Sequence, residues 1–195
     1  MRAYERFLKY AIYPTMSDEA SGTHPSSSKQ LVLARELARE LTELGLDGVE
    51  VDEWGYVYAT LKATEGVKCN DIGFIAHMDT SSEASDENIK PRLVKYDGGD
   101  ILLNEEKGIY MKLADYPYLA DYKGQTLIVS DGTTLIGADD KAGIAEIMSA
   151  LEIIINNDVP HGKISIAFTP DEEIGRGADL FDVKGFGADY AYTSD

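Results

Sequence analysis

Two short apolar runs in the chain pass directly into polar, acidic stretches. Residues 72–76 (IGFIA) lead into residues 77–79 (HMD), and residues 164–168 (ISIAF) lead, two residues on, into residues 171–173 (DEE). Apolar runs of this length predict buried strands of the kind found in a sheet flanked by helices. Ligands in such sheets bind where strands deliver their carboxyl ends into loops. The two acidic stretches are therefore candidates for one shared site.

Three segments have the apolar spacing of a helix that covers a sheet. A short amphipathic helix is predicted over residues 3–11. A longer one is predicted to begin after a serine N-cap at residue 27 or 28 and to continue to about residue 44. The clearest pattern after that lies over residues 140–156. Long helices of this kind, alternating with strands, need a sheet to cover.

The remaining patterns predict further strands and one irregular segment. Alternating residues 48–61 predict a β-hairpin that turns near residues 53–55, and residues 187–195 predict the last strand. Residues 81–125 are polar, with weak periodicity, and are expected to be irregular. The order of elements predicts an α/β fold with three α/β/α layers around a mixed, mostly parallel sheet.

The charge balance excludes several classes of partner. The chain has 18 Lys plus Arg against 35 Asp plus Glu, a net charge of −17, which argues against binding nucleic acid or an anionic membrane surface. No apolar run is long enough to span a bilayer, and residues 1–15 lack the pattern of a signal peptide. The single cysteine, Cys69, allows no internal disulfide. Together these features predict a cytoplasmic protein without nucleic-acid or membrane partners.

His77 and Asp79 are the first candidate site residues. Residues two apart on a strand face the same side, so both side chains can point into one pocket. Neutral imidazole is a common zinc ligand, and a carboxylate beside it often fixes the ring's orientation. Taken alone, a His-x-Asp pair at the end of a strand is more often a structural hydrogen-bonded pair.

Two further acidic pairs have an ordinary structural explanation when each is taken alone. Asp139 and Asp140 open the predicted helix over residues 140–156, where an N-cap and a first-turn acid are common. Glu172 and Glu173 follow a strand, where adjacent glutamates are usually just exposed. Neighbouring carboxylates can also divide two tasks, because one can bind a metal while the other accepts a proton from water.

Considered together, these residues predict a metal centre. His77, Asp139, Glu173 and a carboxylate near residue 195 form a set of oxygen ligands with one imidazole, which suits zinc, cobalt or manganese. The spacing from Asp131 does not match a calcium-binding EF-hand loop. The set is consistent with a two-metal hydrolytic centre bridged by one carboxylate.

Four motifs, taken in order, resemble those of the zinc-dependent exopeptidases and deacylases, and within them the tripeptide aminopeptidases. They are IAHMDT, LIGADDKAGIAEIMSAL, FTPDEEIGRGA and AYTSD. The resemblance spans nearly the whole chain. It implies two Zn²⁺ ions, with Co²⁺ or Mn²⁺ as alternatives, and a small peptide substrate whose N-terminal residue is released. The ligands that it implies are His77 and Asp195 for one ion, Glu173 for the other, and Asp139 as the bridge.

The same resemblance implies roles for three further residues. Glu172 would be the general base and later the acid, and Asp79 would orient His77. Asp139 would be joined to Asp140 by a cis peptide bond. Dipeptidases, carboxypeptidases and N-acyl amino-acid deacylases use a similar centre and remain alternative functions.

The family's chains continue beyond the motifs present here. The resemblance implies that residues 1–195 are the N-terminal portion of the catalytic domain, without the lid or dimerisation domain and the C-terminal catalytic portion. That missing portion would supply a second-zinc histidine, since neither His24 nor His161 matches it. The 195-residue chain alone is therefore expected to be inactive, or to serve as a folding unit or binding module. The full-length protein is expected to be a homodimer.

Overall fold

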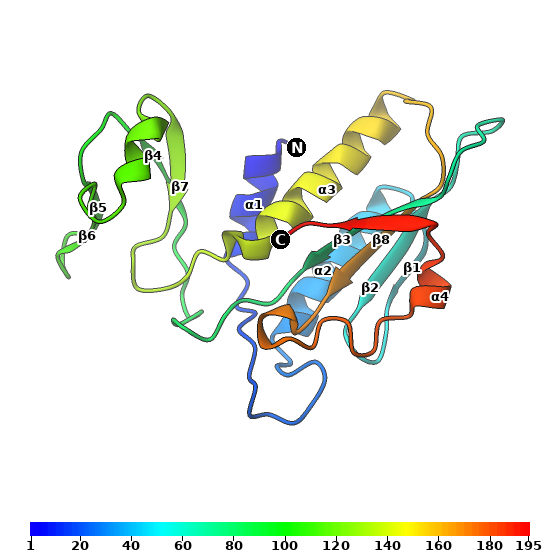
Figure 1. Ribbon diagram of the computed structural model, residues 1–195, viewed down its shortest axis with the longest axis horizontal. Coiled ribbons are helices and arrows are strands. Elements are labelled where there is room, and N and C mark those ends of the chain that lie inside the picture. The colour runs from blue at the N-terminus through cyan, green and yellow to red at the C-terminus, as the bar shows by residue number, and fades with distance from the viewer.

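The computed structural model describes residues 1–195 and is built around a five-stranded mixed sheet (Figure 1). Its strands, in spatial order, are β1 (Asp47–Val51), β2 (Val57–Leu61), β8 (Ile164–Thr169), β3 (Ile72–His77) and β9 (Tyr190–Thr193). β2 is antiparallel to both of its neighbours, whereas β8, β3 and β9 are parallel. Four of the five strands thus point the same way, as the predicted mostly parallel sheet requires.

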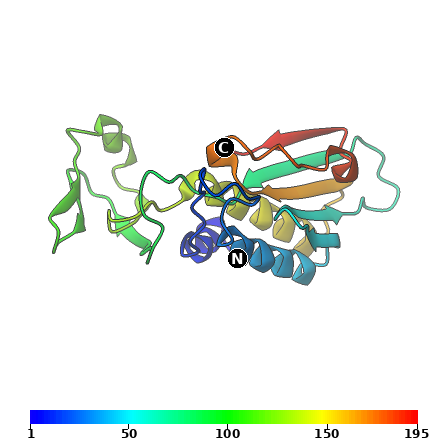
Figure 2. The same cartoon turned by 90° about the horizontal axis from the view of Figure 1, so that it is seen from below.

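The three long helices all lie on one face of this sheet (Figure 2). They are α1 (Ala3–Ala11), α2 (Gln30–Glu43) and α3 (Ala138–Asn156). The opposite face carries only the one-turn helix α4 (Val183–Phe186) and the segments around it. The α/β class is confirmed, but within residues 1–195 the sheet has one helical layer, so the second layer of the predicted α/β/α arrangement is not formed by these residues. None of the helices has the length and apolar character needed to cross a membrane.

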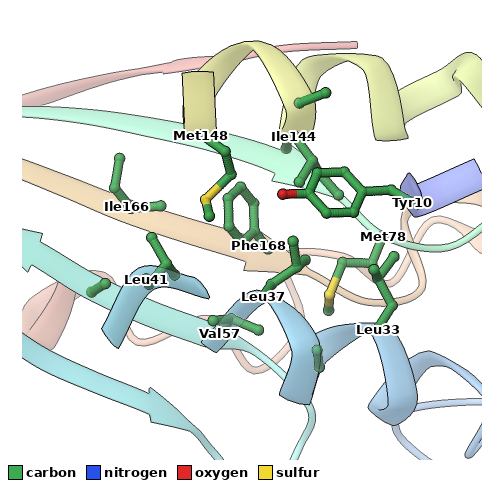
Figure 3. Close-up of a cluster of buried hydrophobic side chains, with 14 of the residues drawn as sticks. Tyr10, Leu33, Leu37, Leu41, Val57, Met78, Ile144, Met148, Ile166 and Phe168 are labelled. Atoms are coloured by element: carbon green, nitrogen blue, oxygen red, sulfur yellow. The ribbon is translucent and has the colours of Figure 1, made fainter. Parts of the chain in front are cut away.

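The core lies between that helical layer and the sheet (Figure 3). Each element turns its apolar face inward, and several side chains have no measurable exposure. Examples are Tyr10 of α1, Leu33, Leu37 and Leu41 of α2, Ile144 and Met148 of α3, and Phe168 of β8. The apolar repeats that predicted the helices therefore mark their buried faces.

Residues 81–125 are more regular than the sequence predicted. β4 (Arg92–Lys95) pairs with β7 (Thr126–Val129), and β5 (Ile101–Asn104) pairs with β6 (Ile109–Met111). With the 3-10 helix η1 (Pro117–Tyr122) they form a lobe that projects from the main sheet, drawn in green in Figure 1. A small cluster of Tyr96, Ile101 and Leu119 fills it. Strands of three or four residues are too short to give a clear alternation, which explains why the prediction was wrong here.

Strand register brings the polar stretches to one edge of the sheet. In the parallel β3–β8 pair His77 lies opposite Thr169, and in the β3–β9 pair Ile75 lies opposite Thr193. The three strands therefore end at nearly the same level. The loops that follow, including the 3-10 helix η2 (Glu172–Ile174), start from that edge. This is the convergence that the sequence predicted.

Candidate metal centre

His77 occupies the centre of the site. It is the last residue of β3 and is almost fully buried. Its Nδ1 lies 3.1 Å from the backbone oxygen of Asp79 and 3.3 Å from Asp79 Oδ1, while its Nε2 lies 2.9 Å from Asp139 Oδ1. Burial opposes protonation of the ring, but the carboxylates of Asp79 and Asp139 outweigh it and raise the pKa of His77 to about 9. The imidazole is thus held by Asp79 on one side and presents Nε2 to the carboxylates on the other.

Asp79 is fully buried and tied to several groups besides His77. Its Oδ1 accepts a hydrogen bond from the Glu172 amide at 2.9 Å, and its Oδ2 accepts one from the Glu173 amide at 3.1 Å. The Ser17 hydroxyl also donates to Oδ2. Burial alone would raise the pKa of Asp79, but the bonds from His77 and Ser17 lower it below its usual value. Asp79 therefore links the His77 strand to the Glu172–Glu173 turn.

The two aspartates at the start of α3 point in different directions. The backbone at Asp139 and Asp140 is not helical, and the peptide bond between them is cis, as the resemblance implied. Asp139 reaches His77 with a carboxylate whose side chain is 64% exposed. Asp140 is buried and accepts hydrogen bonds from the Gly143 amide at 3.1 Å and the Ser194 hydroxyl at 3.2 Å. Burial raises the pKa of Asp140 to about 6. The capping explanation thus fits Asp140 and does not fit Asp139.

Glu172 and Glu173 lie in η2, directly after β8. Glu172 Oε2 is 3.9 Å from His77 Nε2, and its side chain is 45% exposed. Burial raises the pKa of Glu173, with the negative charge of Asp139 acting in the same direction. Both glutamates therefore face the same opening as Asp139, toward solvent.

Two overlapping groups of side chains could hold a metal ion, and both include His77. The first adds Asp139 and Glu173, and the second adds Glu172 and Asp195; within each group the ligand atoms lie within 4.8 Å of one another. All four predicted ligands and the predicted general base thus gather around one imidazole. The second group places Glu172 beside Asp195, a combination that the sequence reasoning did not anticipate. The other two histidines lie elsewhere, since His161 bonds its own turn and His24 packs against Tyr56.

The chemistry of these donors fits a zinc-type ion. One imidazole nitrogen and several carboxylate oxygens match the ligand preferences of zinc, cobalt and manganese. Asp139 and Glu172 are exposed enough to rotate toward an ion, whereas His77 is fixed by Asp79. The site therefore combines one fixed imidazole with carboxylates that are open to solvent.

The sequence reasoning missed the groups that support the site from behind. Ser17, which bonds Asp79, gave no signal because a serine in a polar loop resembles any other. In the sequence, Asp171 stands out only as the first of three consecutive acids. In the structure it is fully buried and bonds Ser26 and Gln30 rather than facing the pocket. Its hydrogen-bond partners lie more than 140 residues away in the chain, a distance that no local pattern records.

Solved structures of peptidases share this fold. A tripeptidase from Staphylococcus aureus superimposes on the whole chain with a TM-score of 0.69 at 28% identity, and aminopeptidase PepT from Bacillus cereus does so with 0.69 at 27%. An aminoacylhistidine dipeptidase from Vibrio alginolyticus, at 22% identity and a TM-score of 0.62, supports the fold alone. The fold is therefore that of part of a peptidase catalytic domain, in which the carboxyl ends of the strands carry the candidate metal centre.

Sequence comparison finds curated proteins named peptidase T among the relatives of the chain. The chain is 58% identical over its whole length to a curated peptidase T from Caldanaerobacter subterraneus subsp. tengcongensis, and 57% identical to one from Clostridium novyi. The resemblance to the tripeptide aminopeptidases is thus confirmed as a resemblance to peptidase T. The chain spans about half the length of these relatives, 48% and 47% respectively. No family model matches the chain.

Proposed function

We propose that this chain forms the metal-binding portion of a zinc-dependent aminopeptidase that releases the N-terminal residue from tripeptides. The observation that carries the proposal is the gathering of His77, Asp139 and Glu173, with Glu172 and Asp195 beside them, at the carboxyl ends of β3, β8 and β9. The similarity to peptidase T, and to solved structures described as a tripeptidase and an aminopeptidase, supports the choice of reaction.

In this proposal the ligands divide as the resemblance implies. His77 and Asp195 would hold one zinc ion, Glu173 would hold the other, and Asp139 would be shared between them. Bound zinc supplies a Lewis acid that polarises the scissile carbonyl and favours ionisation of water. Asp79 keeps the His77 ring oriented through Nδ1, so that Nε2 stays directed at the metal position.

Glu172 moves the protons of the reaction. Its Oε2, close to His77 Nε2 and open to solvent, takes a proton from the attacking water. The water oxygen forms a bond to the carbonyl carbon, and the carbon–nitrogen bond of the peptide then breaks. Glu172 returns the proton to the leaving nitrogen, so the carboxylate is regenerated. The Glu172 backbone is held by its hydrogen bond to Asp79, while its side chain is half-exposed. This arrangement suits a carboxylate that carries a proton from the water to the leaving nitrogen.

The proposal also covers the activity, oligomeric state and location of the intact protein. Activity, substrate choice and a homodimer belong to the intact enzyme, and the chain spans about half the length of its peptidase T relatives. A cytoplasmic location agrees with the absence of a helix able to cross a membrane and with a single cysteine. We expect little or no hydrolysis by the 195-residue chain alone.

A substrate panel tests the reaction. The intact protein is loaded with zinc and assayed on a tripeptide, a dipeptide and an N-acetyl amino acid. We expect release of the N-terminal residue from the tripeptide. Glu172→Gln is expected to keep zinc binding and lose at least 100-fold in turnover. Preferential cleavage of the dipeptide or of the N-acetyl compound would replace the tripeptidase proposal with one of those activities.

A further inference from the structure

The turn that carries Glu172 and Glu173 is held from behind by a second buried carboxylate, Asp171. Asp171 is fully buried, with a left-handed φ of 57°. Its Oδ2 accepts a hydrogen bond from the Ser26 amide at 2.7 Å. Its Oδ1 accepts bonds from the Ser26 hydroxyl at 2.5 Å and from Gln30 Nε2 at 2.7 Å. The loop before α2 and the first residue of α2 therefore hold the Asp171 side chain directly.

The backbone of the turn is fixed at three consecutive residues. The Asp171 amide donates to Gln30 Oε1 at 3.3 Å, and the Glu172 and Glu173 amides donate to Asp79. Two buried carboxylates, Asp79 and Asp171, thus hold the turn from different directions. Buried carboxylates that accept several hydrogen bonds are costly to move, because each bond lost leaves an unsatisfied group away from water.

His24 closes the remaining side of the Asp171 carboxylate. Its Nδ1 lies 3.4 Å from Asp171 Oδ2, and its ring stacks on Tyr56 with the centroids 5.5 Å apart. Both ring nitrogens are buried without a hydrogen-bond partner. The imidazole therefore covers Asp171 and keeps its carboxylate from turning out to solvent.

We propose that Asp171, held by Ser26 and Gln30, is a positioning residue that sets where the Glu172 and Glu173 carboxylates stand relative to His77. The inference deepens the proposed function and rests on it for the identity of the metal. Asp171, Ser26 and Gln30 do not belong to either of the groups that could hold a metal ion. Their effect passes through the backbone of one short turn. Outer groups of this kind commonly change metal affinity by about 10–100-fold.

Hydrogen exchange on the metal-free chain tests the positioning directly. The variants are Asp171→Asn, which exchanges one acceptor for a donor facing Ser26 or Gln30, and Ser26→Ala, which removes one hydroxyl. Ser149→Ala is the matched control, because it removes a buried serine hydroxyl that bonds Ala145 within α3. We expect the amides of Glu172 and Glu173 to exchange at least 10-fold faster in both variants and to be unchanged in the control. Equal exchange in parent and variants, in chains that remain folded, would overturn the proposal.

Zinc titration of the same proteins by calorimetry gives the second readout. We expect the dissociation constant for zinc to rise at least 10-fold in Asp171→Asn and Ser26→Ala. Ser26→Thr keeps a hydroxyl and should bind zinc more tightly than Ser26→Ala. Unchanged affinity despite faster exchange would overturn the claim that the turn's position matters to the metal. A parent that binds no zinc would count against the proposed function instead. Hydrogen exchange tests the positioning of the turn whether or not the parent binds zinc.

Discussion

Asp79 accepts a hydrogen bond from the backbone amide of Glu172 at 2.9 Å, so the carboxylate beside the central histidine also holds the proposed general base. One buried side chain thereby joins the end of β3 to the turn after β8. The sequence suggested only that Asp79 orients His77. The structure adds that moving Asp79 would disturb the turn and the imidazole together.

Asp79→Asn is expected to weaken zinc binding by about 10–100-fold. The amide group that replaces one carboxylate oxygen cannot accept the bonds that Asp79 receives from both the Glu172 and the Glu173 amides. Calorimetric titration with zinc measures the change. Asp47→Asn, at an exposed carboxylate on β1, is the control and should bind as the parent does. Equal affinities for all three proteins would contradict a supporting role for Asp79.

Phe168→Ala is expected to destabilise the chain by about 3–5 kcal/mol, the usual cost of emptying a buried aromatic position. Phe168 is fully buried between the sheet and the helical layer, where Figure 3 shows it beside Met148. Urea unfolding measures the difference. Ile153→Ala, on an exposed position of α3, should change stability by less than about 0.5 kcal/mol. A similar small change at both positions would mean that the core does not lie where the structure places it.

Glu40→Gln is expected to destabilise the packing of α1 on α2 by about 2 kcal/mol. The Glu40 carboxylate is almost buried and accepts bonds from Arg6 at 2.5 Å and from the Tyr10 hydroxyl at 2.9 Å, and it pairs with Lys9. Removing its charge leaves Arg6 buried with only Glu152 as an ion-pair partner. Thermal or urea unfolding of the parent and of Glu40→Gln measures the difference in the free energy of unfolding.

Glu43→Gln serves as the comparison for Glu40. Glu43 lies on the same helix but pairs with Arg39 at an exposed position, so its loss should cost well under 1 kcal/mol. If the two variants were equally stable, the buried network between α1 and α2 would contribute no more than a surface pair.

The stability of the folded chain should decrease at acid pH, in part because Glu36 becomes protonated. Hydrogen bonds from Arg39 and Lys9 outweigh the effect of burial and lower the pKa of Glu36 to about 2 in the folded chain. In the unfolded chain a glutamate has a pKa of about 4.3. The contribution of Glu36 to the free energy of unfolding is therefore complete above that pH and disappears as the pH falls toward about 2. With allowance for solvent screening we expect about 1 kcal/mol at pH 7.

Urea unfolding of Glu36→Gln at several pH values measures this contribution. The variant should be less stable than the parent at pH 7, and the gap should narrow by about pH 3. Glu65→Gln, in an exposed loop and without an ion pair, should follow the parent throughout. A gap that stayed constant between the two pH values would show that the ionisation of Glu36 is not its source.

Local pattern was enough to predict the main sheet and the residues at its edge. The runs at residues 72–76 and 164–168 are buried strands, and the histidine and carboxylates after them meet because parallel strands end together. Asp139 was open to two explanations from sequence. The structure separates them by giving the capping bonds to Asp140 and directing Asp139 to His77.

What the sequence could not predict depends on contacts between distant segments. The lobe around Tyr96 is built from strands too short to show a period, and its cluster forms only when they pair. The bonds from Ser26 and Gln30 to Asp171 join residues more than 140 positions apart. A serine and a glutamine carry no local sign of such a partner, so only the folded chain reveals it.

The central claim is that His77, Asp139 and Glu173 form a metal centre, and zinc titration by calorimetry tests it most directly. The parent chain is compared with Asp139→Ala and Glu173→Ala, and each protein's fold is checked by circular dichroism. We predict that the parent binds zinc and that both variants bind it at least 10-fold more weakly while remaining folded. Zinc binding that is equally strong in all three proteins, or absent from the parent, would contradict the account.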